Sequence, residues 1–163
     1  MATAWKALAT ITLGASQTGV TFSSIPNSYR DLVVIVSGNT ASSDYALNMR
    51  LNSDSSSVYS SVSIEANGAS TSSTSNTTTS MPTWNYNTFS ASTVSSYIAH
   101  ILDYSATDKH KTVIFRQGAA SLGSATALGR YASTSAVSTV YVYAATGNQL
   151  AAGTIVSLYG VSA

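Results

Sequence analysis

Apolar and polar residues alternate along this chain in short segments, a period of two that is typical of β-strands with one buried face. The clearest case is segment 45–52 (YALNMRLN), in which every second residue is apolar. Segment 31–37 (DLVVIVS) is instead an almost continuous apolar run, which favours a strand covered on both sides. No segment of ten or more residues has a helical period, although 55–61 could hold one helical turn. These patterns predict an all-β protein with little helix.

The same patterns predict eight or nine strands. Eight are expected at 6–13, 31–37, 45–52, 95–104, 110–117, 124–132, 138–145 and 154–160, and a ninth at 19–22. The longest break runs from Asn67 to about Thr93 and is rich in Ser, Thr and Asn, so we expect a long crossover connection there. The number of strands and this connection favour one domain over 1–163, an antiparallel β-sandwich of the jelly-roll type.

The composition limits the kinds of partner. Only 8% of the residues are charged, against about 25% in an average soluble protein, while Ser and Thr make up about a third of the chain. The net charge is +1 and the basic residues are scattered, so we expect no nucleic-acid binding. The absence of cysteine excludes disulfides and thiolate metal sites. No stretch of about 18 apolar residues and no signal peptide occurs, so we expect neither a membrane anchor nor standard export.

Groups for catalysis are few, since the chain has six carboxylates and two histidines. His100 alternates with Ile98 and Leu102 on an apolar strand face, so a packed histidine is expected rather than a catalytic base. His110 stands between two lysines, where solvent is expected. No serine is framed as G-x-S-x-G, and the residues around Asp54 lack the spacing of a calcium loop, so a capped turn is expected. We therefore expect no enzyme, cofactor or metal site; a lectin-like or hydrolytic enzyme is the third choice of function.

Ten tyrosines are the one unusual enrichment, because a tyrosine with its apolar ring and polar tip suits an interface. Tyr141 and Tyr143 share a strand face that alternates with Val140 and Val142. If the valines face the core, the tyrosines are an interface candidate; the alternative is that both tyrosines are core residues. Aromatic residues of the long connection are further candidates. The candidate interface residues are Tyr141, Tyr143, Trp84, Tyr86 and Phe89.

Four segments resemble small virion structural proteins of tailed bacteriophages, especially those of cyanobacterial and marine phages. They are FSSIPNSYRDLVVIVSG at 22–38, MRLNSD at 49–54 with Tyr59 following, DYSATDKHKTVIFRQG at 103–118 and GNQLAAGTIVSLYGV at 147–161. Their order and spacing also agree with that family. The chain departs from it at Ser53, where glycine is usual, at Tyr131, where tryptophan is common, and in its opening segment.

The resemblance implies a β-sandwich that stands alone on the phage head or forms the end of a fibre, without enzymatic activity. The leading hypothesis is a capsid decoration (cement) protein that binds the major capsid protein on the head surface of the virion. The alternative is a receptor-binding module at a tail-fibre or tailspike tip, with segment 84–89 touching host surface glycans. Because few lysines protect the strand edges from pairing, we expect a homo-oligomer, with a trimer favoured and with strand 138–145 and the C-terminal strand beside it at the interface. A monomer that oligomerises only on the capsid is the other possibility.

Overall fold

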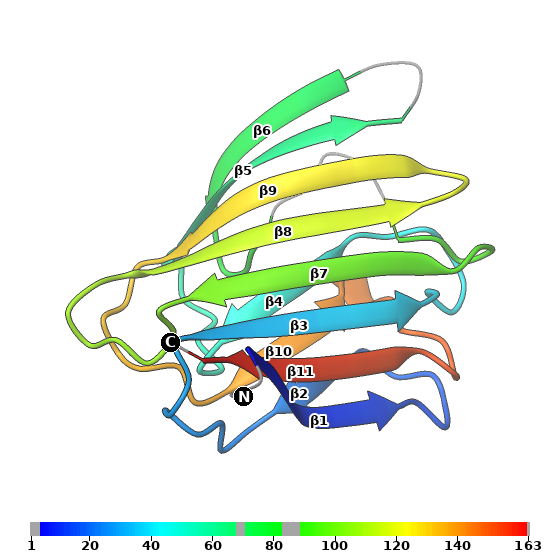
Figure 1. Ribbon diagram of the computed structural model, residues 1–163. Coiled ribbons are helices and arrows are strands. Elements are labelled where there is room, and N and C mark those ends of the chain that lie inside the picture. Colours follow the sequence, from blue (N-terminus) through cyan, green and yellow to red (C-terminus); the bar gives the residue numbers. More distant parts are fainter. Residues whose placement is uncertain (1–3, 68–70, 83–88, 163) are drawn as a thin grey trace.

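The structure is a computed structural model that describes residues 4–67, 71–82 and 89–162, with the backbone alone for 71–76. Strands in this part of the chain form two antiparallel sheets (Figure 1). This arrangement confirms the all-β, antiparallel sandwich predicted from the sequence. Helix is limited, within the described residues, to a single 3-10 turn, η1 (Ala145–Gly147).

The two sheets differ greatly in size. The larger sheet has eight strands, in the order β1 (Trp5–Thr12), β11 (Ile155–Val161), β3 (Asp31–Gly38), β7 (Ser95–Leu102), β8 (Lys111–Ala119), β9 (Gly123–Tyr131), β5 (Tyr59–Ala66) and β6 (Thr71–Thr78). The smaller sheet has three strands, in the order β2 (Gly19–Phe22), β10 (Val140–Ala144) and β4 (Leu47–Leu51).

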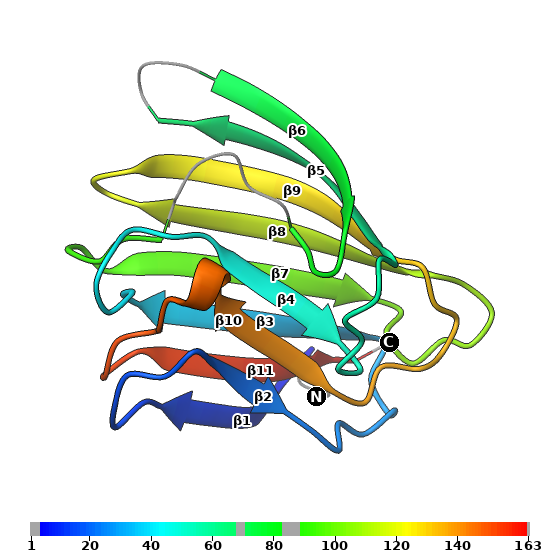
Figure 2. The same ribbon diagram turned by 180° about the vertical axis from the view of Figure 1, so that it is seen from behind.

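The smaller sheet lies across one half of the larger sheet, over β1, β11, β3 and β7 (Figure 2). Val140 and Val142 of β10 and Met49 of β4 are fully buried in the core between the sheets. Met81, which forms an isolated bridge with Met49, extends this core toward β9. At that point a Cβ on Gly129 would lie 2.8 Å from the sulfur of Met81, so only glycine fits there without rearrangement.

Strand β3 occupies the middle of the larger sheet and explains the continuous apolar run in its sequence. Leu32, Val34 and Val36 belong to the core between the two sheets. Val33 points to the opposite side of the larger sheet and is nevertheless only 1% exposed. The prediction that this strand is covered on both sides is therefore confirmed at Val33.

Two strands were missed by the sequence patterns, which predicted eight or nine rather than eleven. Strand β5 begins at Tyr59, so the helical turn considered at 55–61 is wrong. Strand β6 lies inside the predicted long connection, which is therefore shorter than expected. The reason is visible in β5, where Ser61 and Ser63 are buried while Val62 and Ile64 are exposed. In this strand the polar side chains face the core and the apolar side chains face outward, so the alternation did not reveal it.

The two ends of the described chain lie side by side in the larger sheet. Strand β1 pairs with β11, with Trp5 opposite Val161. One residue further out, the backbone N–H of Ser162 donates a hydrogen bond of 3.0 Å to the carbonyl oxygen of Ala4. The chain therefore enters and leaves the fold at the same corner.

Candidate interaction face

The side of the larger sheet that points away from the smaller sheet, called the outer face below, carries an unusual number of apolar side chains. Exposed large apolar residues in the described chain all lie on it except Val94, which directly precedes β7. Ile64 and Leu128 are the most exposed of them, at 58% and 53%. The set on the outer face is Trp5, Val62, Ile64, Ile98, Leu128 and Ile155.

Strand register brings these residues together in rows that cross the sheet. In one row Ile98 of β7 is opposite Arg116 of β8, which is opposite Thr126 of β9, and Thr126 is opposite Ile64 of β5. The neighbouring row runs from His100 through Ile114 and Leu128 to Val62. Apolar residues that are far apart in sequence therefore lie on neighbouring strands of one face, with Arg116, Thr126 and His100 among them.

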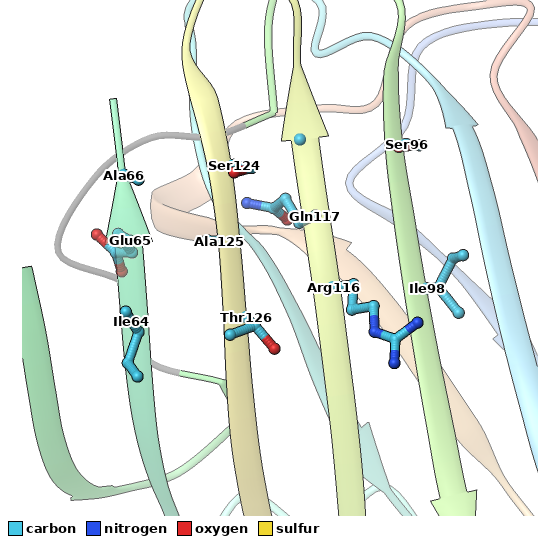
Figure 3. A pocket seen from close by; sticks show the side chains of 11 residues that line it. Ile64, Glu65, Ala66, Ser96, Ile98, Arg116, Gln117, Ser124, Ala125 and Thr126 are labelled. Atoms are coloured by element: carbon cyan, nitrogen blue, oxygen red, sulfur yellow. The ribbon is translucent and has the colours of Figure 1, made fainter. Parts of the chain in front are cut away.

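Three shallow depressions are hollowed into the outer face. The largest, about 480 Å³, is lined by residues of β5, β7, β8 and β9, among them Ile64, Ile98 and Arg116. Figure 3 shows the guanidinium of Arg116 extending from β8 toward Ile98. A second depression, about 230 Å³, is lined by Trp5, Val33 and His100 and shares Ile98 and Arg116 with the first. The third depression, about 340 Å³, is formed by residues of β5, β8 and β9.

This third depression is lined by Val62, Thr112, Leu128 and Arg130 among others. Arg130 and Arg116 are both exposed, and neither forms a hydrogen bond or an ion pair with another described residue. These two arginines are therefore unpaired positive charges among the exposed apolar residues of the outer face.

Asp31 at the end of β3 is the one carboxylate that the described strands place on the outer face, and it is only 3% exposed. It accepts hydrogen bonds from the Arg30 side chain at 2.9 Å and from the Asp103 backbone N–H at 2.9 Å. His100 Nε2 lies 3.3 Å away. Burial acts to raise the pKa of Asp31, but the hydrogen bonds from Asp103, Arg30 and His100 together hold it below its ordinary value.

The contact between His100 and Asp31 has no nucleophile beside it among the described residues. Among the described residues, His100 has this one hydrogen-bond partner, and no serine or threonine hydroxyl lies within reach of its ring. A nucleophile next to the base is what hydrolytic chemistry would require. His100 is about one-third exposed on the outer face, so the expected packed histidine is only partly packed. The apolar face of its strand that the sequence indicated is the outer one.

The other predicted sites follow the sequence more closely. Asp54 forms the capped turn expected of it, because its carboxylate accepts a hydrogen bond of 2.9 Å from the Ser56 N–H. His110 is exposed, as predicted. In the described residues no group of three or more metal-ligating side chains could hold a metal ion, and no helix is long and apolar enough to span a membrane.

The tyrosine strand has the orientation that makes it an interface candidate. Val140 and Val142 face the core, so Tyr141 and Tyr143 lie on the outside of the smaller sheet, where both are partly exposed. Their rings stack with centroids 4.8 Å apart and planes 8° apart. The guanidinium of Arg50 lies 5.1 Å from the centroid of Tyr143. This second surface is called the tyrosine face.

The remaining candidates divide into two groups. Trp84 and Tyr86 lie outside the described residues. Phe89 is fully buried and exchanges two backbone hydrogen bonds with Tyr45, so its side chain is part of the core and presents no surface to a partner.

The sequence could have indicated the outer face through Ile98 and Ile114, which give β7 and β8 apolar residues on both sides. Comparison with protein-family models, curated proteins and solved structures finds no match to this chain.

Proposed function

We propose that this chain is a structural protein of a tailed-phage virion, a capsid decoration protein that binds the outer surface of the head and stabilises it. The observation that carries the proposal is the outer face, an exposed apolar surface on a rigid sheet. Monomeric proteins seldom expose connected apolar patches larger than a few hundred Å², and larger ones mark interaction sites. Two further observations support the proposal. No nucleophile lies beside His100 among the described residues, and four segments resemble phage virion proteins.

A second candidate, the receptor-binding module at a fibre or tailspike tip, is supported by the tyrosine face. Stacked aromatic rings beside an arginine can contact planar or sugar ligands. Phe89 no longer supports this alternative, because its side chain is buried. The outer face has six exposed large apolar side chains, whereas Tyr141 and Tyr143 are only partly exposed, so the decoration role remains first.

Electron microscopy of the virion that contains this chain tests the two candidates. We expect density for the β-sandwich on the head, across joints between major capsid subunits. Heads prepared without the chain should lose their contents at a lower temperature than complete heads, and added purified chain should restore the difference. Density confined to the tail would contradict the decoration role and favour the receptor-binding module.

A further inference from the structure

The two arginines of the outer face lie where an approaching partner must desolvate them. Arg116 lines two of the three depressions, and Ile98 shares both of these depressions with it. Arg130 lines the third depression together with Leu128 and Val62. A partner that covers these apolar residues therefore also removes water from both guanidinium groups. Removing a charge from water is strongly unfavourable unless a partner of opposite charge takes its place.

The outer face itself supplies no such partner. Asp31 already binds Arg30 and lies near His100, and four of the other five carboxylates are on loops. Glu65 lines the largest depression together with Arg116, but it is only 1% exposed and its carboxylate accepts a hydrogen bond from the Ser63 hydroxyl. An unpaired arginine among apolar residues is typical of a protein interface, in which arginine is enriched and often contributes much of the affinity.

We propose that the outer face binds a protein surface that carries apolar side chains and at least two carboxylates, one for Arg116 and one for Arg130. This inference rests on the proposed function, because it takes the partner to be the capsid shell. From the strand spacing and the rise per residue, the two arginine backbones are roughly 14 Å apart, which sets the approximate spacing of the carboxylates. Guanidinium and carboxylate form paired hydrogen bonds, so each contact also fixes orientation.

The size of the face fits a partner of this kind. From β1 to β5 it covers roughly 600 Å² of sheet before side-chain relief is counted, and a standard interface takes about 800 Å² from each partner. A second copy of this chain fits less well. Twofold packing of the face on itself would bring arginines toward arginines without a free carboxylate between them.

The test measures binding of purified chain to heads assembled without it. The double variant Arg116→Glu/Arg130→Glu should weaken binding by at least about tenfold, because reversed charges would face the carboxylates of the shell. The matched control, Lys6→Glu/Lys109→Glu, makes the same change in net charge at exposed lysines away from the outer face and should bind within about threefold of wild type. Arg116→Lys/Arg130→Lys keeps both charges and should bind more tightly than the glutamate variant, but less tightly than wild type, because an ammonium cannot form the paired hydrogen bonds.

A carbodiimide cross-link supplies a readout that a loss of folding cannot imitate. This reagent joins a carboxylate to an amine in direct contact, and arginine does not react. The variant Arg116→Lys should therefore gain a cross-link from position 116 to an acidic residue of the shell, which wild type lacks. Arg50→Lys, which places an amine on the tyrosine face, should gain none.

Each unfavourable outcome has a distinct meaning. If wild type binds heads and both glutamate double variants bind equally well, the inference is wrong and the decoration role stands. A cross-link from position 50 instead of 116 would move the contact to the tyrosine face and also overturn the inference. If free wild-type chains associate with one another and Leu128→Asp abolishes that association, the outer face binds a second copy of this chain and the inference is wrong. If wild type does not bind heads at all, both proposals fail.

Discussion

The residue with the clearest effect on pH-dependent stability is Asp31. Its pKa is lower in the folded protein than in the unfolded chain, so its contribution is complete above the unfolded pKa of about 3.9. That contribution is lost as the pH falls through the folded pKa. Asp31→Asn should reduce the free energy of unfolding by about 2 kcal/mol at pH 6, because it weakens hydrogen bonds to a charged group. The difference from wild type should shrink below about pH 4.

Urea unfolding of both proteins between pH 2 and 6 measures this difference. Asp108→Asn is the matched control, because Asp108 is exposed in a loop and forms no hydrogen bond or ion pair with another described residue. The control should follow the wild-type curve within about 0.5 kcal/mol. A gap between Asp31→Asn and wild type that stays constant down to pH 2 would contradict the assigned pKa.

The number of tyrosines predicted their exposure only in part. Their number indicated exposed interface residues, but of the nine that the structure describes four are buried. A buried phenol is tolerated when its hydroxyl finds an internal partner. Tyr59 is an example, since its hydroxyl accepts a hydrogen bond from the Leu51 N–H at 3.0 Å. Composition cannot reveal such partners, because they come from distant turns. The four are Tyr59, Tyr97, Tyr104 and Tyr131, and the Tyr97 hydroxyl, unlike that of Tyr59, has no hydrogen-bond partner among the described residues.

Among the turns, the one after β4 offers a direct test of backbone conformation. Asn52 and Ser53 are both left-handed, with φ of 52° and 56°. Asn tolerates this region better than Ser, and Ser53 stands where the resembling phage proteins usually have glycine. Ser53→Gly should therefore raise the free energy of unfolding by up to about 1 kcal/mol, since relief of strain exceeds the entropy lost.

Chemical denaturation at neutral pH measures the effect of this substitution. Ser55→Gly in the same loop is the control, because Ser55 is exposed and does not have a positive φ. It should lower stability by about 0.5–1 kcal/mol through the greater freedom of glycine in the unfolded chain. Equal destabilisation by both substitutions would show that the turn does not strain Ser53.

At the level of strands, alternation predicted most of the fold. Nine strands lie within a few residues of their expected positions, because each has apolar residues on its core side. Strand β5 fails this rule: Ser61, Ser63 and Glu65 point inward, while Val62 and Ile64 point to the outer face. The outer face was missed for the same reason, since alternation assigns one apolar side to each strand.

For the molecule as a whole, the predicted trimer remains to be measured. The tyrosine face supports it, because Tyr141 and Tyr143 point outward from a small sheet. Light scattering at micromolar concentration should give about three times the chain mass of 16.8 kDa. Tyr141→Asp/Tyr143→Asp should reduce this to one chain, because charges at the centre of an interface are strongly unfavourable.

The control for the trimer is Tyr141→Phe/Tyr143→Phe, which keeps both rings and should remain assembled. Thermal unfolding of each variant shows whether the chain is still folded. A wild-type mass near that of one chain would mean that the free chain is a monomer and that any oligomer forms only on the capsid. A trimer that persists in the aspartate variant would place the subunit contact elsewhere.

The adjacent ends of the chain have a practical consequence. Because Ala4 and Ser162 are hydrogen-bonded neighbours, anything joined to one end emerges beside anything joined to the other. Such a sandwich can be inserted into a loop of a host polypeptide without pulling that loop apart, as is common for domains whose termini are close together. It can also carry two different cargoes, an enzyme and a fluorophore for example, at a single corner. Two molecules joined to the two ends would therefore be held side by side.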